Sequence, residues 1–585
     1  MKSLRSLIRF LRPYRWPAII ALILLAAQIV ADLMIPNLTQ RAIDQGIAAG
    51  DLAMVWQTAG IMLGAAVVSA ALAVCNTLLS VRVAQSFGAD IRREIVKTVQ
   101  SWSFGNLDRI RTGQLMVRTT SDVNMVQMIC MMGLRILTRM PLLMVGSIFM
   151  LIRTSSAMAT IIAVLLPVLI GAMALLATKA RPLFKTVQER LDRLNNVLQE
   201  NLAGVRVVKA FVRNDHENAR FEAANLDLTN QSIHVFQLLS VLMPLLMVIL
   251  NLGVVAAVWF GGRYVIEGSL SLGALVASIN YLMSSLFPVM LLGSLVGPLA
   301  AAEASAGRIL EVLDDTPSIQ EIAEPVPLPE DAAGHLRLEE VSFSYDGNGG
   351  DPVLCDVSLE ARPGERVAIL GETGSGKSSL VHLIPRFYDV TEGRVTLDGI
   401  DVRELPLEEL RSRIGMALQE TVLFSGTVRD NIRYGRPEAT DDEVIEAARI
   451  AQAHDFIAAL PNGYDTAVGQ RGVNFSGGQK QRLAIARALL VKPLVLILDD
   501  STSAVDVDTE ARLEEALDAA MRDMTAIVIA QRVSTALTAD RIVVLERGRV
   551  AATGTHEELL ATSPIYQEIF ASQLGNGGAR NGHTA

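Results

Sequence analysis

Long stretches without a charged residue constrain the fold of this chain more than any other feature. Four of them exceed the roughly 20 residues that cross a bilayer as a helix, and they cover 52–81, 154–178, 228–262 and 268–302. Shorter runs at 16–30 and 141–152 add a first and a third span, the latter if Arg135 and Arg139 lie near the membrane edge or face protein or water. One such run is compatible with a buried core helix, but several together predict six membrane spans.

The basic leader indicates how these spans are oriented. Its five cations precede the first span, and the apolar residues between them recur at helical spacing. This pattern predicts an interfacial helix over 1–15 on the cytoplasmic face. A basic leader before an apolar run also resembles a signal peptide, but no small-residue cleavage site follows and more spans do, so the first apolar run is predicted to be a retained membrane helix. The connections at 82–130 and 179–230 are long and charged, whereas the other turns between spans are short. Both termini are therefore predicted to be cytoplasmic.

Composition separates this membrane half from the rest of the chain. Residues 1–320 carry 27 Lys and Arg against 19 Asp and Glu, whereas the remainder carries 25 against 42. From His335 onwards, short β-rich runs and then alternating strands and helices are typical of an α/β nucleotide-binding fold. We expect a transmembrane domain over 16–315, a proline-rich linker over 316–334, a nucleotide-binding domain over 335–574 and a disordered tail over 575–585. The three cysteines lie far apart without the spacing of metal ligands, and their odd number argues against a disulfide framework.

The segment GETGSGKS, from Gly371 to Ser378, predicts a phosphate-binding loop. It follows VAIL, the buried-strand pattern that this motif requires. Its glycines let backbone N–H groups turn towards phosphate, Lys377 reaches the β- and γ-phosphates, and Ser378 ligates Mg²⁺. Asp499, at the end of the strand pattern LVLILDD, is a second magnesium candidate, with helix capping as the alternative. The predicted ATP and Mg²⁺ contacts in this region are Gly371, Thr373, Gly374, Ser375, Gly376, Lys377, Ser378, Ser379 and Asp499.

These motifs, with FSGGQ at 475–479 and the six spans, together resemble a half-size ATP-binding cassette (ABC) exporter from the leader to about residue 574. The resemblance implies an all-α six-helix transmembrane domain followed by an α/β P-loop nucleotide-binding domain with a β-rich subdomain and a helical signature subdomain. It also implies that two cassettes pair head to tail. Each ATP then lies between the phosphate loop of one chain and the FSGGQ segment of the other.

The resemblance implies roles for residues outside the phosphate loop. Tyr345 would stack on adenine, Gln419 would sense Mg²⁺ and the attacking water, and Asp506 would lie in the loop between the two sites. Taken alone, a tyrosine after a strand is usually a packing residue and a lone glutamine is usually solvated. The predicted contacts to the partner's nucleotide are Ser476, Gly477, Gly478 and Gln479. Phe475 stands where leucine is usual. Residues 118–123 and 204–211 resemble coupling helices that dock on the cassettes, and GQRG at 469–472 resembles their partner loop.

Two departures from the family's hydrolytic pattern affect the expected mechanism. Asp500 replaces a glutamate that polarises the attacking water, and a carboxylate about 1 Å out of place can cost roughly a hundredfold in rate. Gln531 replaces a histidine that contacts the γ-phosphate, and glutamine carries no positive charge and shuttles no proton. Either change alone is compatible with neutral drift in a working ATPase. Together they resemble the degenerate-site subunit of heterodimeric multidrug-type ABC exporters.

The sequence therefore predicts an ATP-driven transport ATPase of a bacterial inner or plasma membrane, paired with a homologous half-transporter in a heterodimer. A nucleotide-gated regulatory or channel-like subunit, an importer of exporter shape and a slow homodimeric exporter are the alternatives. The expected substrate is a small amphipathic molecule or lipid, and no nucleic-acid partner is expected. Gln28, Asp32, Asn76, Asn251 and Asn280 are polar groups at membrane depth, for which a helix-to-helix hydrogen bond is the first interpretation.

Overall fold

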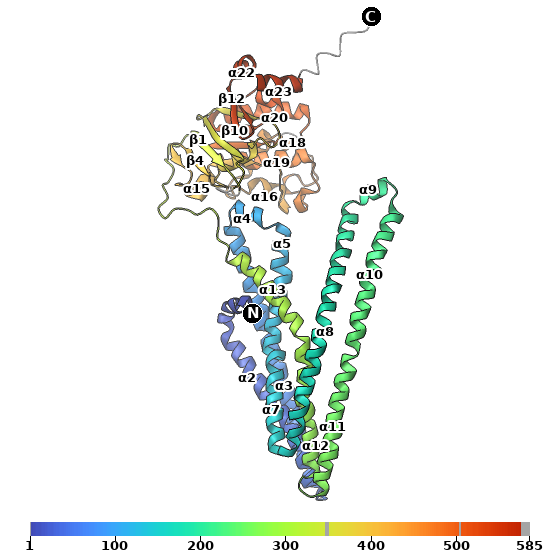
Figure 1. Cartoon of the computed structure of the whole chain (residues 1–585). Helices are drawn as coiled ribbons and strands as arrows, with labels where there is room; N and C mark the ends of the chain where they lie inside the picture. The colour runs from blue at the N-terminus through green and yellow to red at the C-terminus, as the bar shows by residue number, and fades with distance from the viewer. Residues whose placement is uncertain (1, 346–349, 502–504, 575–585) are drawn as a thin grey trace. The chain divides into compact units, whose positions relative to one another are not determined.

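The computed structural model describes residues 2–345, 350–501 and 505–574, so the tail expected to be disordered lies outside the described residues (Figure 1). The chain divides into two compact units. One unit comprises Met1–Gln100 with Thr112–Asp315, and the other comprises Ser101–Arg111 with Thr316–Ala585. The short segment Ser101–Arg111 therefore groups with the nucleotide-binding part of the chain, although its neighbours on both sides belong to the membrane part.

Among the residues that the structure describes, the membrane unit contains six helical stretches long and apolar enough to cross a bilayer. All six predicted spans are confirmed as helices of this kind, and the helical stretches are Lys2–Ile47, Leu52–Ser101, Thr112–Thr154, Ser156–Ala203, Asn214–Ile266 and Leu272–Leu291. Their helices are α2 (Arg15–Arg41), α3 (Leu52–Ser101), α6 (Val123–Met132) with α7 (Thr138–Thr154), α8 (Ser156–Ala203), α10 (Asn214–Ser240) with α11 (Leu242–Ile266), and α12 (Leu272–Ser294).

The core of the membrane unit is formed where α7, α8, α11 and α12 pack together. Leu151, Met158, Leu169 and Tyr281 are fully or almost fully buried in this cluster. Other apolar side chains of the spans are largely exposed, among them Trp259 at 74%. A soluble protein rarely exposes apolar surface on this scale, so these faces suit contact with lipid.

The leader folds as two short helices, α1 (Lys2–Leu7) and the 3₁₀ helix η1 (Ile8–Tyr14). The backbone N–H groups of Ser3 and Leu4 donate to the Glu303 carboxylate on α13 (Val296–Leu313), at 2.9 and 3.1 Å. Tyr14 donates to Asp90 on α3 at 2.8 Å. The leader is thus tied to two other helices of the membrane unit.

The second unit is built around two β-sheets. The antiparallel sheet has the strand order β2 (Leu354–Ala361), β1 (Leu336–Phe343), β4 (Glu392–Leu397) and β5 (Ile400–Asp401). The larger sheet has the order β12 (Arg549–Gly554), β11 (Arg541–Glu546), β3 (Arg366–Leu370), β10 (Thr525–Ile529), β9 (Val495–Asp499) and β6 (Ile414–Ala417). All its pairs are parallel except the edge pair β11–β12. Every residue of β3, β9 and β10 is buried, as expected for central parallel strands.

A group of helices flanks this sheet and carries the FSGGQ segment. It comprises α16 (Val428–Arg433), α17 (Asp441–Ile450), α18 (His454–Ala458) and α19 (Gly477–Leu490). Capping boxes start three of these helices, at Thr427, Thr440 and Ser476. Each places a side-chain oxygen on an otherwise unpaired helix N–H. Their apolar faces share one buried cluster with the sheet residues Leu496 and Leu498. The fold class predicted from the sequence is confirmed.

Candidate nucleotide-binding site

Glycines shape the loop between β3 and α14 (Lys377–Leu383), as its sequence predicts. Gly371 has φ 155° and Gly376 has φ 99°, conformations that side chains with a Cβ rarely adopt. A Cβ at Gly371 would lie 2.2 Å from the backbone oxygen of Leu545, and one at Gly376 would lie 2.8 Å from Leu354 Cδ2. Both positions therefore require glycine. Ser375, between them, has a buried hydroxyl with no hydrogen-bond partner among the described residues.

Lys377 lies at the centre of this loop. Its Nζ donates to the backbone oxygens of Gly371 at 2.8 Å and Glu372 at 2.7 Å. Burial lowers the pKa of Lys377, while the charges of Asp499 and Asp500 oppose that shift. A cation held inside a glycine-rich loop is the arrangement that a triphosphate requires.

Ser378 and Asp499 meet at the start of α14 and the end of β9. The Ser378 hydroxyl donates to Asp499 Oδ1 at 3.3 Å, and Asp499 is 3% exposed. Burial raises the pKa of Asp499, against the hydrogen bond from Ser378 and the charge of Lys377. Hydroxyl and carboxylate oxygens are the ligands that Mg²⁺ prefers, and Mg²⁺ usually takes one or two carboxylates together with substrate phosphates. One hydroxyl and one carboxylate fit a Mg²⁺ whose remaining ligands include phosphate oxygens of a bound nucleotide.

Asp500 follows directly and is held by two glutamine side chains. Gln531 Nε2 donates to Asp500 Oδ2 at 2.7 Å, and Gln419 Nε2 donates to the same oxygen at 3.3 Å. An ionised carboxylate only accepts hydrogen bonds, which requires both amide nitrogens to point towards it. The parallel strands β9 and β10 end side by side and bring Asp500 and Gln531 together. The structure thus joins the two residues by which the sequence departs from the hydrolytic pattern.

Tyr345, just after β1, is placed against the helix that follows the phosphate loop. Its hydroxyl lies 2.8 Å from Ser379 Oγ, and its ring meets that of Tyr388 edge to face at 5.2 Å. The side chain remains 50% exposed. A half-exposed ring anchored at both its edge and its hydroxyl is available for stacking on a base.

The FSGGQ segment forms the start of α19. The Ser476 hydroxyl accepts from the N–H of Gln479 at 3.3 Å, and Gln479 Oε1 accepts from the N–H of Ser476 at 2.9 Å. Phe475 is buried beside Phe456 and takes no part in this cap. Ser476 and Gly477 are exposed, so the start of the helix is open to a ligand from outside the chain.

Asp506 caps a different helix, α20 (Val507–Ala520). Its Oδ1 accepts from the N–H of Thr509 at 3.0 Å, and hydrogen bonds from the Thr509 N–H and hydroxyl lower the pKa of Asp506. The residue predicted to link two sites therefore has a local capping role. Residues 502–504 of the same loop lie outside the described residues.

Two family models match the two halves of the chain. The model of the ABC transporter transmembrane region matches residues 18–289, and the ABC transporter model matches residues 354–503. An uncharacterized ABC transporter ATP-binding protein of Bacillus subtilis (strain 168), YfiB, is 40% identical over 578 residues, which cover 99% of this chain and 100% of that protein. The chain belongs to the ABC transporter family.

Further comparisons place this ABC transporter among exporters. The ATP-dependent lipid A-core flippase of Syntrophus aciditrophicus (strain SB) is 37% identical over 492 residues, or 84% of this chain and 81% of that protein. The structure of a bacterial Atm1-family ABC exporter with ATP bound matches with a TM-score of 0.78 and 26% identity, over 96% of this chain and 98% of that chain. The protein is an ABC exporter with an ATP-binding cassette for ATP-driven transport.

The transporter's cassette unit includes a docked helix that the sequence did not lead us to expect. Helix α4 (Phe104–Arg109) comes from the long connection after the second span. The Phe104 ring stacks on Phe387 at 4.2 Å, and Asp108 accepts a hydrogen bond of 2.6 Å from the Tyr388 hydroxyl. Burial and this hydrogen bond raise the pKa of Tyr388. The aromatic pair in RFYD, directly after the phosphate-loop helix, was the available sequence signal.

The expected coupling helix at 118–123 is wrong. Residues Arg118–Asp122 form a π-helical turn inside the membrane unit, where they pair with α13. Arg118 lies 2.7 Å from Glu311, and Asp122 pairs with Arg308. The polar residues that suggested a docking surface thus contact another helix of the same unit. At 204–211 the structure has the short helix α9 (Val205–Ala210), which joins α8 to α10 (Figure 1). Its docking on a cassette stays a prediction.

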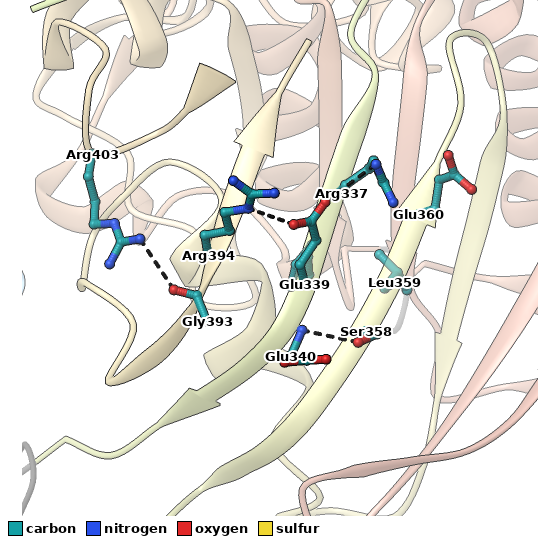
Figure 2. A pocket seen from close by; sticks show the side chains of 10 residues that line it. Arg337, Glu339, Glu340, Ser358, Leu359, Glu360, Gly393, Arg394 and Arg403 are labelled. Carbon is teal, nitrogen blue, oxygen red and sulfur yellow. Dashed lines mark hydrogen bonds and ion pairs between the residues drawn. The ribbon is translucent and has the colours of Figure 1, made fainter. Parts of the chain in front are cut away.

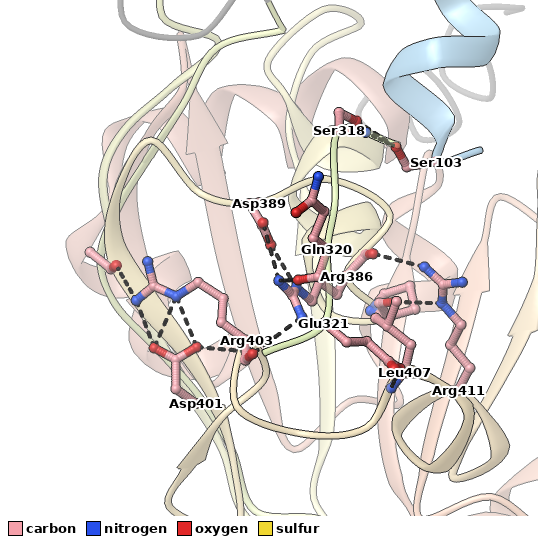
Figure 3. Close-up of polar contacts among 12 residues, drawn as sticks. Ser103, Ser318, Gln320, Glu321, Arg386, Asp389, Asp401, Arg403, Leu407 and Arg411 are labelled. Atoms are coloured by element: carbon pink, nitrogen blue, oxygen red, sulfur yellow. Dashed lines mark hydrogen bonds and ion pairs between the residues drawn. The ribbon is translucent and has the colours of Figure 1, made fainter. Parts of the chain in front are cut away.

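The segment expected to be a linker, which begins at residue 316, is held on the cassette unit by polar contacts (Figure 3). The Ser318 N–H donates to Ser103 Oγ at 3.0 Å, beside α4. Buried Arg386 donates to the backbone oxygen of Gln320 at 3.1 Å, and Glu321 accepts from the N–H of Leu407 at 2.7 Å. The chain segments that enter and leave the cassette unit are therefore joined to each other.

A polar groove on the antiparallel sheet is a poor second candidate for a ligand site (Figure 2). It measures ≈ 840 Å³ and is lined by residues of β1, β2 and β4. Arg394 and Arg337 both pair with Glu339, at 2.6 and 3.3 Å. The three arginines that line the groove are matched by three glutamates, so the lining has no excess positive charge to attract an anion.

Proposed function

We propose that this exporter is one chain of a heterodimer and that the site built on its own phosphate loop hydrolyses ATP slowly. The observation that carries the proposal is the pair of amide donors on the Asp500 carboxylate. A general base has to accept a hydrogen bond from the attacking water. Gln531 and Gln419 both donate to Oδ2 of this carboxylate and so compete with the attacking water for that oxygen, and neither supplies the positive charge that stabilises a developing phosphate charge.

In this arrangement the remaining parts bind nucleotide. Backbone N–H groups of the phosphate loop and Lys377 hold the triphosphate, while Ser378, Gln419 and Asp499 hold Mg²⁺. Tyr345 stacks on the adenine. When bound, Mg²⁺ neutralises charge on the β- and γ-phosphates. The chain's residues therefore bind and orient ATP, while Asp500 activates water poorly.

The FSGGQ segment serves the site of the partner chain. Ser476, Gly477, Gly478 and Gln479 present a hydroxyl and helix N–H groups at the exposed start of α19. Such a helix start favours phosphate oxygens. ATP bound to the homologous partner is completed by these residues, and that composite site carries the faster hydrolysis.

The membrane unit exports an amphipathic small molecule or a lipid across a bacterial inner or plasma membrane, with both termini in the cytoplasm. The relative named a lipid A-core flippase supports a lipid-like substrate, and the basic leader supports the orientation. Asn76, one of the polar groups at membrane depth, makes a hydrogen bond between helices and not a substrate contact, since its side-chain N–H donates to the backbone oxygen of Ala21 at 2.7 Å.

ATPase activity of the purified chain, alone and with its homologous partner, tests this proposal. We expect the single chain to hydrolyse ATP slowly and the pair to hydrolyse it fast. The fast rate of the pair should persist when this chain carries Lys377→Ala. Fast hydrolysis by the single chain, abolished by Lys377→Ala, would make it a homodimeric exporter instead. Vesicle transport by the pair distinguishes the channel-like alternative, because only a pump moves substrate uphill.

A further inference from the structure

Three spans share a polar cluster in the middle of the membrane unit. Asp32 on α2 accepts a hydrogen bond of 2.5 Å from Ser69 on α3 and pairs with Arg139 on α7 at 3.0 Å. Asp32 lies 15 residues before Ile47, Arg139 lies 15 before Thr154, and Ser69 lies 17 after Leu52. At a rise of 1.5 Å per residue, each is about 22–26 Å from the nearest end of its span. Helix ends placed at the surface of the bilayer would put these residues about halfway through its roughly 40–45 Å thickness, headgroups included.

A second arginine lies one turn from this ion pair. Arg135 and Arg139 are four residues apart on the same helical stretch, and side chains at this spacing share one face. No acidic side chain among the described residues forms an ion pair with Arg135, which is half-buried. This helical stretch therefore carries two guanidinium groups, whereas the polar cluster holds one carboxylate, that of Asp32, which pairs with Arg139.

The backbone at Arg135 is also unusual. Gly133–Leu137 form a π-helical turn (η4) between α6 and α7, with Arg135 at its centre. Such turns inside α-helices often occur at functional sites. Pro141 accounts for a local break, because its ring displaces the carbonyl four residues before it, at Leu137. Pro141 does not explain why Arg135, which forms no ion pair among the described residues, lies in this part of the helix.

Charges at this depth face protein or a water-filled cavity, since exposure to lipid tails costs several kcal/mol. The Asp32 and Arg139 side chains are 25% and 37% exposed, so the cluster is open to a ligand. Guanidinium groups form paired hydrogen bonds with phosphate and carboxylate. An anionic group would pair with Arg135, which has no acidic partner among the described residues, and would compete with Asp32 for Arg139.

We propose that Arg135 and Arg139 form a binding site for the anionic headgroup of an amphiphile, with Asp32 as an internal competitor for the same guanidinium. As a substrate site, it rests on the proposed function of the membrane unit. The binding step itself needs neither ATP hydrolysis nor a partner chain, because all three residues are on this chain.

Binding of dodecyl phosphate to the purified full chain tests the site. The chain is kept in an uncharged maltoside detergent without nucleotide, and isothermal titration compares dodecyl phosphate with dodecyltrimethylammonium. Arg135→Gln should weaken dodecyl phosphate binding about tenfold or more, the loss of one charge-assisted hydrogen-bonded contact. Asp32→Asn should tighten it, because Arg139 loses its carboxylate. A misfolded variant cannot produce tighter binding. Arg153→Gln, near the outer end of the same span, is the matched control.

Equal loss in Arg135→Gln and Arg153→Gln, weaker binding in Asp32→Asn, or preference for the cationic amphiphile would each overturn the site. If the binding results hold but the chain paired with its homologue moves no substrate uphill, the site stands and the transport proposal fails. If transport is found but Arg135→Gln and Asp32→Asn both leave dodecyl phosphate binding unchanged, the transport proposal stands and this site fails.

Discussion

Gln531 Nε2 lies 2.7 Å from Asp500 Oδ2, although 31 residues separate them in the sequence. The contact makes the two departures from the hydrolytic pattern one structural unit. A glutamate at 500 would carry the carboxylate one methylene further out, and a histidine at 531 would offer a ring in place of the amide. The pair is therefore expected to respond to substitution jointly.

The double variant Asp500→Glu, Gln531→His should raise the ATPase rate of the purified single chain by about tenfold to a hundredfold, since a misplaced base costs about that much. Each single substitution should gain much less, because the unchanged partner keeps the site mismatched. Steady-state phosphate release measures the rates, with Lys377→Ala in the double variant as the background. Additive gains from the two single changes would contradict the coupling, and an unchanged rate would contradict the slow-site assignment.

Tyr345 is expected to bind adenine through its ring and not through its hydroxyl. Tyr345→Ala should weaken ATP binding by about 1–3 kcal/mol, the usual value for a base stacked on an aromatic ring. Tyr345→Phe loses only the contact with Ser379 and should bind ATP nearly normally. Titration with a fluorescent ATP analogue gives both affinities. A purely packing role predicts the opposite pattern, with lower thermal stability and unchanged affinity in Tyr345→Ala.

Features encoded in contiguous sequence were predicted well. In the described part of the chain the six apolar runs form six helices long and apolar enough to cross a bilayer, and the pattern before Gly371 is strand β3. Asp499 is the last residue of β9, and the buried strand pattern alone places this carboxylate at the carboxyl end of the strand. Each of these predictions needs only chain periodicity and local conformational preference.

Features that depend on pairs of distant segments were not predicted. Helix α4 is only six residues long, and it is recognised by what Phe104 and Asp108 contact nearly three hundred residues away. The expectation at 118–123 failed for the same reason, since Asp122 and Arg118 have partners on α13 that spacing does not reveal. The Gln531 contact was recoverable in principle, because neighbouring parallel strands end at one edge.

Phe104 should hold α4 on the cassette unit. Phe104→Ala removes a stacked aromatic pair, worth about 0.5–1.5 kcal/mol beyond its buried area. Amide hydrogen exchange over 103–110 should therefore become faster. Leu107→Ala is the control on the same helix, because Leu107 is 39% exposed, and it should leave exchange there nearly unchanged. Equal acceleration in both variants would indicate lost helix propensity and not lost docking.

Arg386 should fasten the linker more firmly than any surface ion pair. The residue is 3% exposed and bonds Asp389 at 2.7 Å as well as the oxygens of Arg403 and Gln320. Arg386→Gln should lower the free energy of unfolding of the cassette unit by about 1.5–3 kcal/mol, since hydrogen bonds to a buried cation are lost. Arg394→Gln breaks an exposed pair with Glu339 and should cost about 0–1 kcal/mol. Thermal unfolding of the full chain ranks the two, and hydrogen exchange at 318–322 locates the effect. Equal destabilisation, or unchanged exchange in the linker, would show that Arg386 does not anchor it.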